Sequence, residues 1–321
     1  QEPKRIARHA GHATTLQEKH GNDWHNTTIF ISVKNNFERR LGIWPAGFDK
    51  DDVLYSNTAY GDYPTLLPKD AQGKDFTKGL FPGWMLLNYQ KPVQVSSTFG
   101  GYQPNLAVDE DIKTYWSAKT ANPGEYYQTD LGEISTINAI QINYADQDVE
   151  FKGKTSGKMH QYKIYSSNDG KNWKTLIDKS KNITDVPHDY IELEKPAKAR
   201  FLKMENLKMP TGKFALSGFR VFGSGAGAKP DKVEDFVPLR ADPKKYGERR
   251  SIWMKWKQNQ NADGYVIYFG KSPDKLYGSI MVYGKNEYFF TGADRVDAYY
   301  FQIEAFNNNG ISERSPVFKS E

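Results

Sequence analysis

Residues 105–116 bring carboxylates, a hydroxyl and an indole into one short stretch of the chain, contributed by Asp109, Glu110, Asp111, Thr114 and Trp116. Aspartates at alternate positions, with a threonine soon after, can direct oxygen atoms toward a hard cation such as Ca²⁺. The other interpretation is a turn whose aspartates cap their own backbone while Trp116 fills the core. Since Ca²⁺ takes about 6–8 oxygen ligands, the turn supplies only part of a site. We therefore predict a structural Ca²⁺ at Asp109, Asp111 and Thr114, with self-capping as the alternative.

The composition indicates that β-strands position these residues. With 321 residues, the chain is long enough for two or three domains. Aromatic residues make up 14% of it, including 20 Tyr and 7 Trp. That content suits β-rich modules with polar surfaces and aromatic ligand faces better than a helical enzyme core.

The charge, the cysteine content and the hydropathy of the chain exclude some partners and some kinds of chemistry. The net charge of +5 arises from 44 basic against 39 acidic residues, with no block of like charge, so we predict no nucleic-acid partner. The chain has no cysteine, which excludes disulfides and thiol chemistry without deciding the compartment. No apolar run approaches the roughly 20 residues of a membrane span, so no transmembrane segment is predicted. The chain begins at Gln1 without Met or signal peptide, which predicts a fragment or a processed piece.

Five ordered motifs surround the acidic turn, at residues 96–98, 127–132, 165–173, 199–203 and 219–223. In this order and spacing they resemble a discoidin-type domain (the coagulation factor C-type fold). In bacterial glycan-degrading enzymes that domain is called carbohydrate-binding module family 32. The resemblance covers about residues 88–224 and implies an eight-stranded antiparallel jelly-roll sandwich, which we place at 87–224. It also implies a metal turn near one end and a ligand site on the loops beside it.

One position departs from the family pattern. Many such domains carry a Glu just before the closing apolar run, and it supplies a bidentate arm to the ion, but this chain has Gly218 there. Losing that carboxylate predicts weaker Ca²⁺ affinity unless carbonyls or water replace it. The motif positions further imply that Trp116 and Trp173 lie in the core and that Arg200 makes a buried ion pair.

The resemblance also implies sugar contacts from the loops, because such modules place an aromatic face against a pyranose and polar groups near its hydroxyls. The alternative for each residue is packing or a solvated loop position. The loop at residues 146–160 could equally brace a neighbouring catalytic domain, as a spacer module does. The predicted contacts are Tyr102, Phe151, Lys154, His160 and Phe214.

The first 86 residues read as an incomplete sheet. Residues 13–17 and 24–31 are strand-like and flank a hairpin turn, and residues 47–55 form a second turn leading into another strand. Proline and glycine then accumulate between residues 64 and 83, which is a linker composition. One sheet alone buries too little apolar surface to be stable, so this segment requires a neighbour.

Motifs at residues 11–14, 21–25, 37–51 and 60–64 resemble the last blade of glycoside hydrolase family 43. The resemblance implies one blade, residues 1–86, of a five-bladed β-propeller that cleaves arabinosides or xylosides with inversion. Its two catalytic carboxylates, about 6.5–9.5 Å apart in an inverting enzyme, would lie on earlier blades, so no catalytic residue is assigned here. The resemblance places His12 toward the propeller axis, near a central metal or its water shell. The alternative is a hydrogen-bonded strand histidine.

The C-terminal part follows a small-residue segment, residues 223–230, that predicts a flexible break. Residues 252–257, 264–270 and 299–310 resemble strands B, C and F of a fibronectin type III sandwich at 225–321. The resemblance implies Trp256 in the core, Tyr299 or Tyr300 as the corner tyrosine, and a role as spacer or docking element.

The predicted fold class is therefore all-β: a partial propeller blade, a discoidin-like jelly-roll sandwich and a fibronectin type III-like sandwich. The first functional hypothesis is the non-catalytic C-terminal portion of a secreted, periplasmic or cell-surface bacterial glycoside hydrolase. Its partners would be polysaccharide or oligosaccharide and the upstream blades. The alternative is a stand-alone glycan-binding or surface-scaffolding protein without hydrolase activity.

Overall fold

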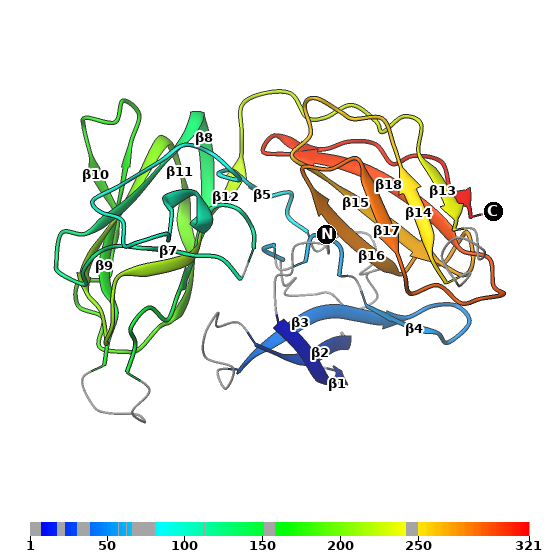
Figure 1. Ribbon diagram of the computed structural model, residues 1–321, viewed down its shortest axis with the longest axis horizontal. Coiled ribbons are helices and arrows are strands. Elements are labelled where there is room, and N and C mark those ends of the chain that lie inside the picture. The colour runs from blue at the N-terminus through cyan, green and yellow to red at the C-terminus, as the bar shows by residue number, and fades with distance from the viewer. Residues whose placement is uncertain are drawn as a thin grey trace.

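The computed structural model describes residues 8–17, 23–30, 39–56, 58–61, 63–65, 81–111, 113–150, 158–241 and 250–320. Within these ranges the chain forms strands and one short 3-10 helix, η2 (Pro104–Ala107), so the all-β prediction is confirmed. The strands fall into three groups, which we call the N-terminal sheet, the middle domain and the third domain (Figure 1).

The N-terminal sheet is an antiparallel meander whose four strands lie in chain order. Asp49 forms the turn before the last strand, because its Oδ1 accepts hydrogen bonds from the backbone N–H groups of Asp51 (2.8 Å) and Val53 (3.0 Å). A four-stranded meander is compatible with a propeller blade, and the blade remains a prediction. The strands are β1 (Arg8–Gln17), β2 (Asp23–Phe30), β3 (Arg39–Phe48) and β4 (Leu54–Ser56).

The middle domain contains eight strands, in the order β10-β9-β11-β8-β12-β5, with β6 on β8 and β7 on β12. They are β5 (Met85–Leu86), β6 (Val93–Val95), β7 (Trp116–Ser117), β8 (Tyr126–Tyr144), β9 (Gln161–Ser167), β10 (Lys174–Asp178), β11 (His188–Lys208) and β12 (Ala215–Ser224).

The two long strands make this sheet a sandwich. The pairing of β8 with β11 breaks register between Glu192 and Ala197 and again between Ala199 and Phe201. Before the break at Ala199 and Phe201, β8 pairs with β6 and with residues 201–205, and beyond it β8 pairs with residues 188–199 and with β12. Because bulges bend strands, β8 and β11 each contribute to both layers.

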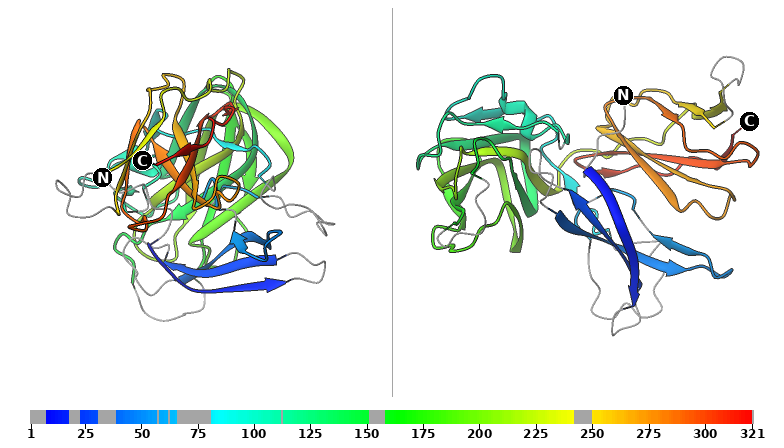
Figure 2. Two further views of the ribbon diagram at one scale, coloured as in Figure 1. Left: turned by 90° about the vertical axis from the view of Figure 1, so that its right-hand side faces the viewer. Right: turned by 60° about the horizontal axis from the view of Figure 1, so that its bottom comes forward.

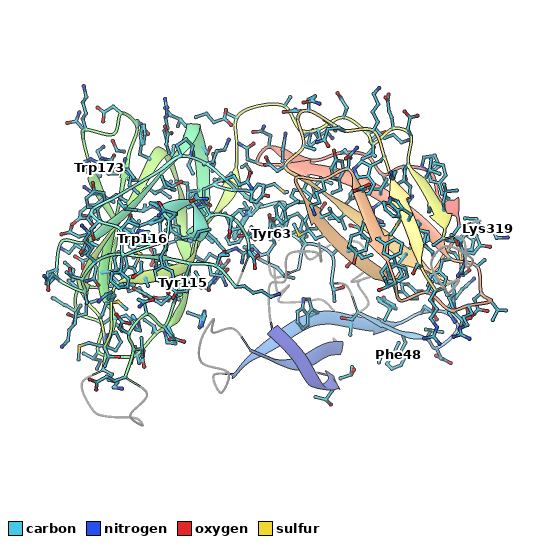
Figure 3. The ribbon with its side chains drawn as sticks, viewed as in Figure 1. Phe48, Tyr63, Tyr115, Trp116, Trp173 and Lys319 are labelled. Carbon is cyan, nitrogen blue, oxygen red and sulfur yellow. The ribbon has the colours of Figure 1, made fainter. Side chains whose placement is uncertain are left out.

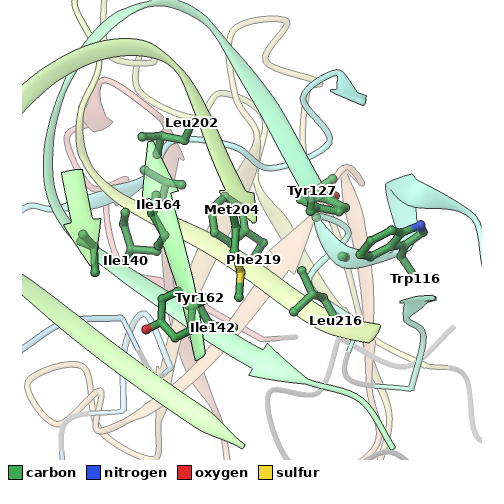
Figure 4. Close-up of a cluster of buried hydrophobic side chains, with 14 of the residues drawn as sticks. Trp116, Tyr127, Ile140, Ile142, Tyr162, Ile164, Leu202, Met204, Leu216 and Phe219 are labelled. Carbon is green, nitrogen blue, oxygen red and sulfur yellow. The ribbon is translucent and has the colours of Figure 1, made fainter. Parts of the chain in front are cut away.

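The layers enclose a single apolar core. Buried and half-buried residues alternate along most of β8, as expected for a strand with one face on a core. Trp116 is fully buried, as predicted, and packs 5.1 Å from Tyr127 between ring centroids (Figure 4). The core also contains Ile140, Ile142, Tyr162, Ile164, Leu202, Met204, Leu216 and Phe219.

The third domain is a smaller sandwich of two sheets, β13-β14-β17 and β16-β15-β18-β19, with β20 on β18. Trp256 lies in its core, and the Tyr299 hydroxyl accepts a hydrogen bond from the Asp294 N–H (3.2 Å), the contact that a corner tyrosine makes. The fibronectin type III assignment remains a prediction. The strands are β13 (Val237–Arg240), β14 (Ile252–Lys255), β15 (Gly264–Gly270), β16 (Gly278–Tyr283), β17 (Glu287–Phe290), β18 (Tyr300–Asn307), β19 (Gly310–Ile311) and β20 (Phe318–Lys319).

The segment between the two sandwiches is not the flexible break that its composition predicts. The N–H of Gly225 donates to the Asn308 carbonyl (2.8 Å), and the N–H of Gly227 donates to Asn309 Oδ1 (3.0 Å). The side-chain amides of Asn307 and Asn309 both donate to the Ala228 carbonyl. The composition indicates only backbone freedom, whereas these partners come from the β18–β19 turn, about 80 residues further along the chain.

A shared aromatic cluster joins the two sandwiches, which lie side by side in Figure 1 and in the right view of Figure 2. Every residue of β12 except Ser224 is buried. One face of this strand lines the core of the middle domain, and the other contacts the third domain and the residues before the middle domain. Phe222 packs 5.2 Å from Tyr63, and Tyr283 packs 5.2 Å from Phe306, between ring centroids. Residues before the middle domain therefore help to fix it on the third domain.

Candidate functional site

Three loops of the middle domain are joined at one end of the sandwich, at residues 99–103, 146–150 and 209–214. The Lys213 N–H donates to the Gln147 carbonyl (2.9 Å), and the Glu150 N–H donates to Thr211 Oγ1 (3.2 Å). Gly212 has φ +75°, and a Cβ there would lie 2.4 Å from the Gln147 carbonyl oxygen. Only glycine fits this close approach, so the two loops are held in fixed register.

A stack of aromatic rings runs from the core to the surface at this end. Tyr115 is buried at 5% exposure, and Tyr102 stacks on it with centroids 4.5 Å apart. Phe99, which is 36% exposed, lies nearly parallel to Tyr102 at 6.2 Å. Figure 3 shows Tyr115 low in the middle domain, away from Trp173. Because the buried ring supports the outer two, this loop end carries an aromatic surface with a fixed orientation.

Polar groups surround the stack. The Tyr115 hydroxyl donates to Gln147 Oε1 (2.7 Å), and Gln147 Nε2 donates to Asp148 Oδ1 (2.7 Å). Lys213 Nζ lies 3.0 Å from Asp148 Oδ2 and 4.7 Å from the Phe99 ring centroid. Burial, followed by the hydrogen bond with Tyr102, raises the pKa of Tyr115 above its usual value, so its hydroxyl stays a neutral donor near pH 7. The arrangement provides ring stacking, a cation, a carboxylate and an amide side by side.

Of the predicted sugar contacts, Tyr102 belongs to this loop end. Phe151 and Lys154 lie outside the described residues. His160 is 4% exposed, and its Nδ1 accepts a hydrogen bond from the Val186 N–H (3.1 Å). Phe214 is fully buried, with its ring 5.3 Å from that of Trp116. Burial leaves no face of His160 or Phe214 for a surface ligand, so both are packing residues and we leave them out of the site.

Sequence reasoning missed Phe99, Tyr115, Gln147, Asp148 and Lys213. The signal was partly present, since Phe99 and Lys213 occupy the same two loops as the predicted Tyr102 and Phe214. Sequence does not show which of two neighbouring aromatic residues faces outward, because that depends on how the loops pack.

Two further predictions from the motifs need correction. Trp173 is half-buried rather than in the core, and Lys203 Nζ lies 4.5 Å from its ring centroid. Arg200 does form the predicted ion pair, a bidentate contact with Asp130 at 2.8 Å for both bonds. The Arg200 side chain is 41% exposed, however, so the pair is at the surface and not buried.

The acidic turn directs three oxygens toward one another. Thr114 Oγ1 lies 2.8 Å from Asp109 Oδ2 and 2.9 Å from the Asp111 carbonyl oxygen. One hydroxyl proton cannot serve both acceptors at once, so Thr114 donates to one of these oxygens at a time. The turn also caps itself, because the Asp111 N–H donates to Asp109 Oδ1 (2.9 Å) and the Lys113 N–H donates to Asp111 Oδ1 (3.0 Å). Both interpretations of the turn thus have a contact that supports them.

The donor set at this turn would supply only part of a weak Ca²⁺ site, and the bound ion stays a prediction. Asp111 directs its carbonyl rather than its carboxylate to Thr114, and Gly218 adds no side chain. Among the described residues, no three of the His, Cys, Asp and Glu side chains gather closely enough to hold a metal. Asp109 Oδ2, Thr114 Oγ1 and the Asp111 carbonyl oxygen would hold the ion, with water or other carbonyls completing the shell.

The third acidic residue of the turn serves another purpose. Glu110 has φ +58° and accepts two hydrogen bonds from Arg220 of β12, each 2.9 Å long. The two side chains are only 7% and 5% exposed. Arg220 also donates to Gln141 Oε1 (2.5 Å). The turn is therefore fixed to β12 by a buried ion pair, a contact that requires no metal.

His12 lies in β1, and its side chain is outside the described part of the structure. Its predicted place near a propeller axis stays a prediction. Among the described residues, no helix is long and apolar enough to cross a membrane.

Comparison with known proteins identifies the middle domain. The model of the F5/8 type C domain family matches residues 92–218, so the chain contains a discoidin-like domain, as predicted. No curated protein matches the chain significantly.

Solved structures similar to the chain include three carbohydrate-binding modules. Chitosan-binding module 1 of a chitosanase/glucanase from Paenibacillus sp. IK-5 is 22% identical, with TM-score 0.36, covering 43% of this chain and 99% of that one. The module CpGH89CBM32-6 of Clostridium perfringens is 20% identical, with TM-score 0.35, covering 44% and 100%. The family 32 module of Clostridium perfringens NanJ, solved in complex with galactose, is 15% identical, with TM-score 0.35, covering 43% and 98%.

Proposed function

We propose that the F5/8 type C domain binds a glycan at its loop end, with the sugar ring on Phe99 and Tyr102. The stack that rises from buried Tyr115 to exposed Phe99 is the observation that supports this function. Ring faces that remain accessible at a rigid end of a domain suit the apolar face of a pyranose. Lys213 and Asp148 stand close enough to the rings to exchange hydrogen bonds with sugar hydroxyls, and buried Gln147 holds Asp148 in place.

The loop geometry favours binding without a large conformational change. The backbone contacts between residues 147–150 and 211–213 already fix these loops, and the Phe99 N–H donates to the Ser117 carbonyl (2.8 Å). A preformed site loses less conformational freedom when a ligand binds. We expect modest affinity for single sugars, because the surface is open and only a few polar groups converge on it.

A titration tests the site. Galactose, arabinose and xylose are added to the purified chain while tyrosine and tryptophan fluorescence is followed. We expect saturable binding of at least one sugar, its loss in Tyr102→Ala, and no change in Tyr190→Ala. Tyr190 is a matched control because it is 46% exposed on β11, outside the three loops. A flat response to all three sugars, or equal binding by Tyr102→Ala, would contradict the proposed site.

The wider proposal is that the chain is the non-catalytic C-terminal portion of an exported glycoside hydrolase of the arabinoside or xyloside class. Its support is the family 43-like motif order together with a four-stranded N-terminal meander. In this account the upstream blades carry the catalytic carboxylates, and His12 faces the propeller axis. The chain alone should not turn over aryl arabinosides or xylosides, and measurable hydrolysis would refute the assignment.

A second function, bracing, is supported by the contacts of the N-terminal sheet with the third domain. Asp49 accepts a hydrogen bond from the Tyr277 hydroxyl (2.7 Å) and pairs with Lys275 (2.9 Å). Tyr55 stacks on Tyr277 with centroids 4.8 Å apart. In this account the third domain holds the N-terminal sheet in place, whether or not the loop end binds sugar. A sugar titration without any fluorescence response would leave bracing as the only function of the two.

A further inference from the structure

The middle domain exposes one broad sheet face that the loop-end site does not use. The layer formed by β6, β9, β10 and the adjoining halves of β8 and β11 turns alternate residues outward. The outward residues include Tyr126 on β8, Lys203 on β11 and Tyr165 on β9, while Leu202 and Met204 point into the core.

The opposite layer is covered. Its strand β12 is buried on both faces, and Phe222 and Ala139 belong to the cluster shared with the third domain. In Figure 3, Tyr63 lies on the covered side of the middle domain, and Trp173 lies on the opposite side. The face around Lys203 is therefore directed away from the rest of the chain.

Three aromatic rings surround one lysine on this face. Lys203 Nζ lies 4.5 Å from the centroid of Trp173, 5.4 Å from that of Tyr165 and 5.9 Å from that of Tyr126. All three rings are half-buried, so each keeps an exposed part. The lysine stem is flexible, and its ammonium can turn toward a ligand hydroxyl while the rings stay in place.

The spacing of the rings suits a ligand longer than one sugar. Tyr126 and Tyr165 stand on strands either side of β11, where Glu205 is opposite Tyr126 and Lys203 is opposite Tyr165. Two strand spacings separate them by about 9–10 Å across the sheet. Rings separated in this way across an open sheet face suit successive units of an extended chain better than a single pyranose.

The charges on this face balance. Lys163 pairs with Asp178 (3.1 Å), Arg200 pairs with Asp130 (2.8 Å), and Glu205 accepts a hydrogen bond from the Tyr165 hydroxyl (2.9 Å). With Lys203, these make three cationic and three anionic side chains. These six side chains together give a polyanion such as nucleic acid or an acidic polysaccharide no net attraction. The charge pattern is complementary to a neutral ligand rich in hydroxyl groups.

We propose that this face is a second glycan-binding site, which takes an extended neutral polysaccharide along Tyr126, Tyr165 and Trp173. Sugar faces would lie on the rings, and Lys203 and Glu205 would exchange hydrogen bonds with hydroxyls between them. The site does not depend on the loop end, because none of its residues belongs to the loops at 99–103, 146–150 and 209–214. The loop end suits one sugar, and this face suits the interior of a chain.

Native affinity electrophoresis of the full chain through gels containing soluble arabinoxylan or galactan tests the proposal. We expect one of these polymers to retard the wild-type protein. Trp173→Ala and Tyr126→Ala should each raise the dissociation constant for that polymer by about tenfold. Polygalacturonate should retard the protein less than the neutral polymers. Tyr102→Ala at the loop end and Tyr190→Ala on the other half of β11 should be retarded like the wild type.

Two variants on opposite sides of Lys203 keep the test independent of local folding, and the melting temperature of each shows whether the domain is intact. Retardation of folded Trp173→Ala and Tyr126→Ala equal to that of the wild type would overturn the proposal, as would no retardation of the wild type by either neutral polymer. Loss of retardation only in Tyr102→Ala would overturn this second site while supporting the loop-end function.

Discussion

At the scale of single residues, Arg220 connects the acidic turn to the rest of the domain. It is almost fully buried, binds both oxygens of Glu110, and lies 4.9 Å from the Phe222 ring centroid. Arg200 makes the same bidentate contact with Asp130, but at the surface. Comparing the two arginines therefore shows how burial changes the contribution of the same bidentate ion pair to stability.

We predict that Arg220→Met lowers the free energy of unfolding by about 3–5 kcal/mol, because Glu110 is left buried without its partner. Arg200→Met should cost about 0–1 kcal/mol, because water screens an exposed pair. Chemical denaturation of both variants measures the difference. Similar losses in the two would show that burial does not set the cost.

Calcium should have a smaller effect than Arg220. A site with one converging carboxylate corresponds to a dissociation constant of about 10⁻⁴–10⁻³ M. Addition of about 10 mM Ca²⁺ would then raise the free energy of unfolding by about 1.4–3 kcal/mol, and a chelator would reverse the change. Asp109→Ala should abolish this dependence, whereas Asp231→Ala, at an exposed position, should keep it. A melting temperature that does not change with Ca²⁺, or one that still rises with Ca²⁺ in Asp109→Ala, would exclude the site.

At the scale of elements, the loop end depends on a close backbone contact. Gly212 combines φ +75° with 2.4 Å between a built Cβ and the Gln147 carbonyl oxygen, whereas a Cβ at Gly101 would meet nothing within 4 Å. We predict that Gly212→Ala separates the loops at 146–150 and 209–214, lowers stability by about 1–3 kcal/mol and weakens sugar binding. Gly101→Ala should keep both properties near the wild-type values. Calorimetry and the sugar titration report the two effects, and an unchanged Gly212→Ala variant would contradict this account of the loop end.

At the scale of the whole molecule, a buried carboxylate joins parts that are distant in sequence. Glu304 of β18 accepts hydrogen bonds from the hydroxyls of Tyr60 (2.6 Å) and Tyr268 (2.8 Å) and from Arg314 Nε (2.9 Å). Burial, then the nearby charge of Glu304, raises the pKa of Tyr60 well above its usual value, so this donor stays protonated. The aromatic cluster around Tyr60 spans the segment before the middle domain, the middle domain itself and the third domain.

We predict that this interface makes the two sandwiches unfold together, so that calorimetry of the wild type shows one main transition. Glu304→Ala should lower the melting temperature and separate the transition into two, because two buried hydroxyls lose their acceptor. Glu287→Ala is the matched control, since its side chain is 51% exposed and pairs weakly with Lys255 (3.6 Å). Two transitions in the wild type would show that the sandwiches unfold independently, and one unchanged transition in Glu304→Ala would show that Glu304 does not couple them.

Features encoded by neighbouring residues could be predicted from the amino-acid sequence. Strand periodicity and turn residues predicted an all-β chain, the order of the discoidin motifs located the middle domain, and Trp116 was correctly assigned to the core. Tyr102 was placed on the loop that does carry the ring stack. These predictions succeeded because alternation, turn chemistry and motif spacing are local properties of the chain.

The direction of each side chain and its contact partners, in contrast, could be seen only in the folded chain. His160, Phe214 and Trp173 were misplaced, and the glycine-rich linker proved to be fixed by asparagines of the β18–β19 turn. Glu110 pairs with Arg220, which lies 110 positions later in the chain. Burial and pairing depend on contacts between segments far apart in the chain, and a one-residue change of register reverses the face on which a strand residue lies.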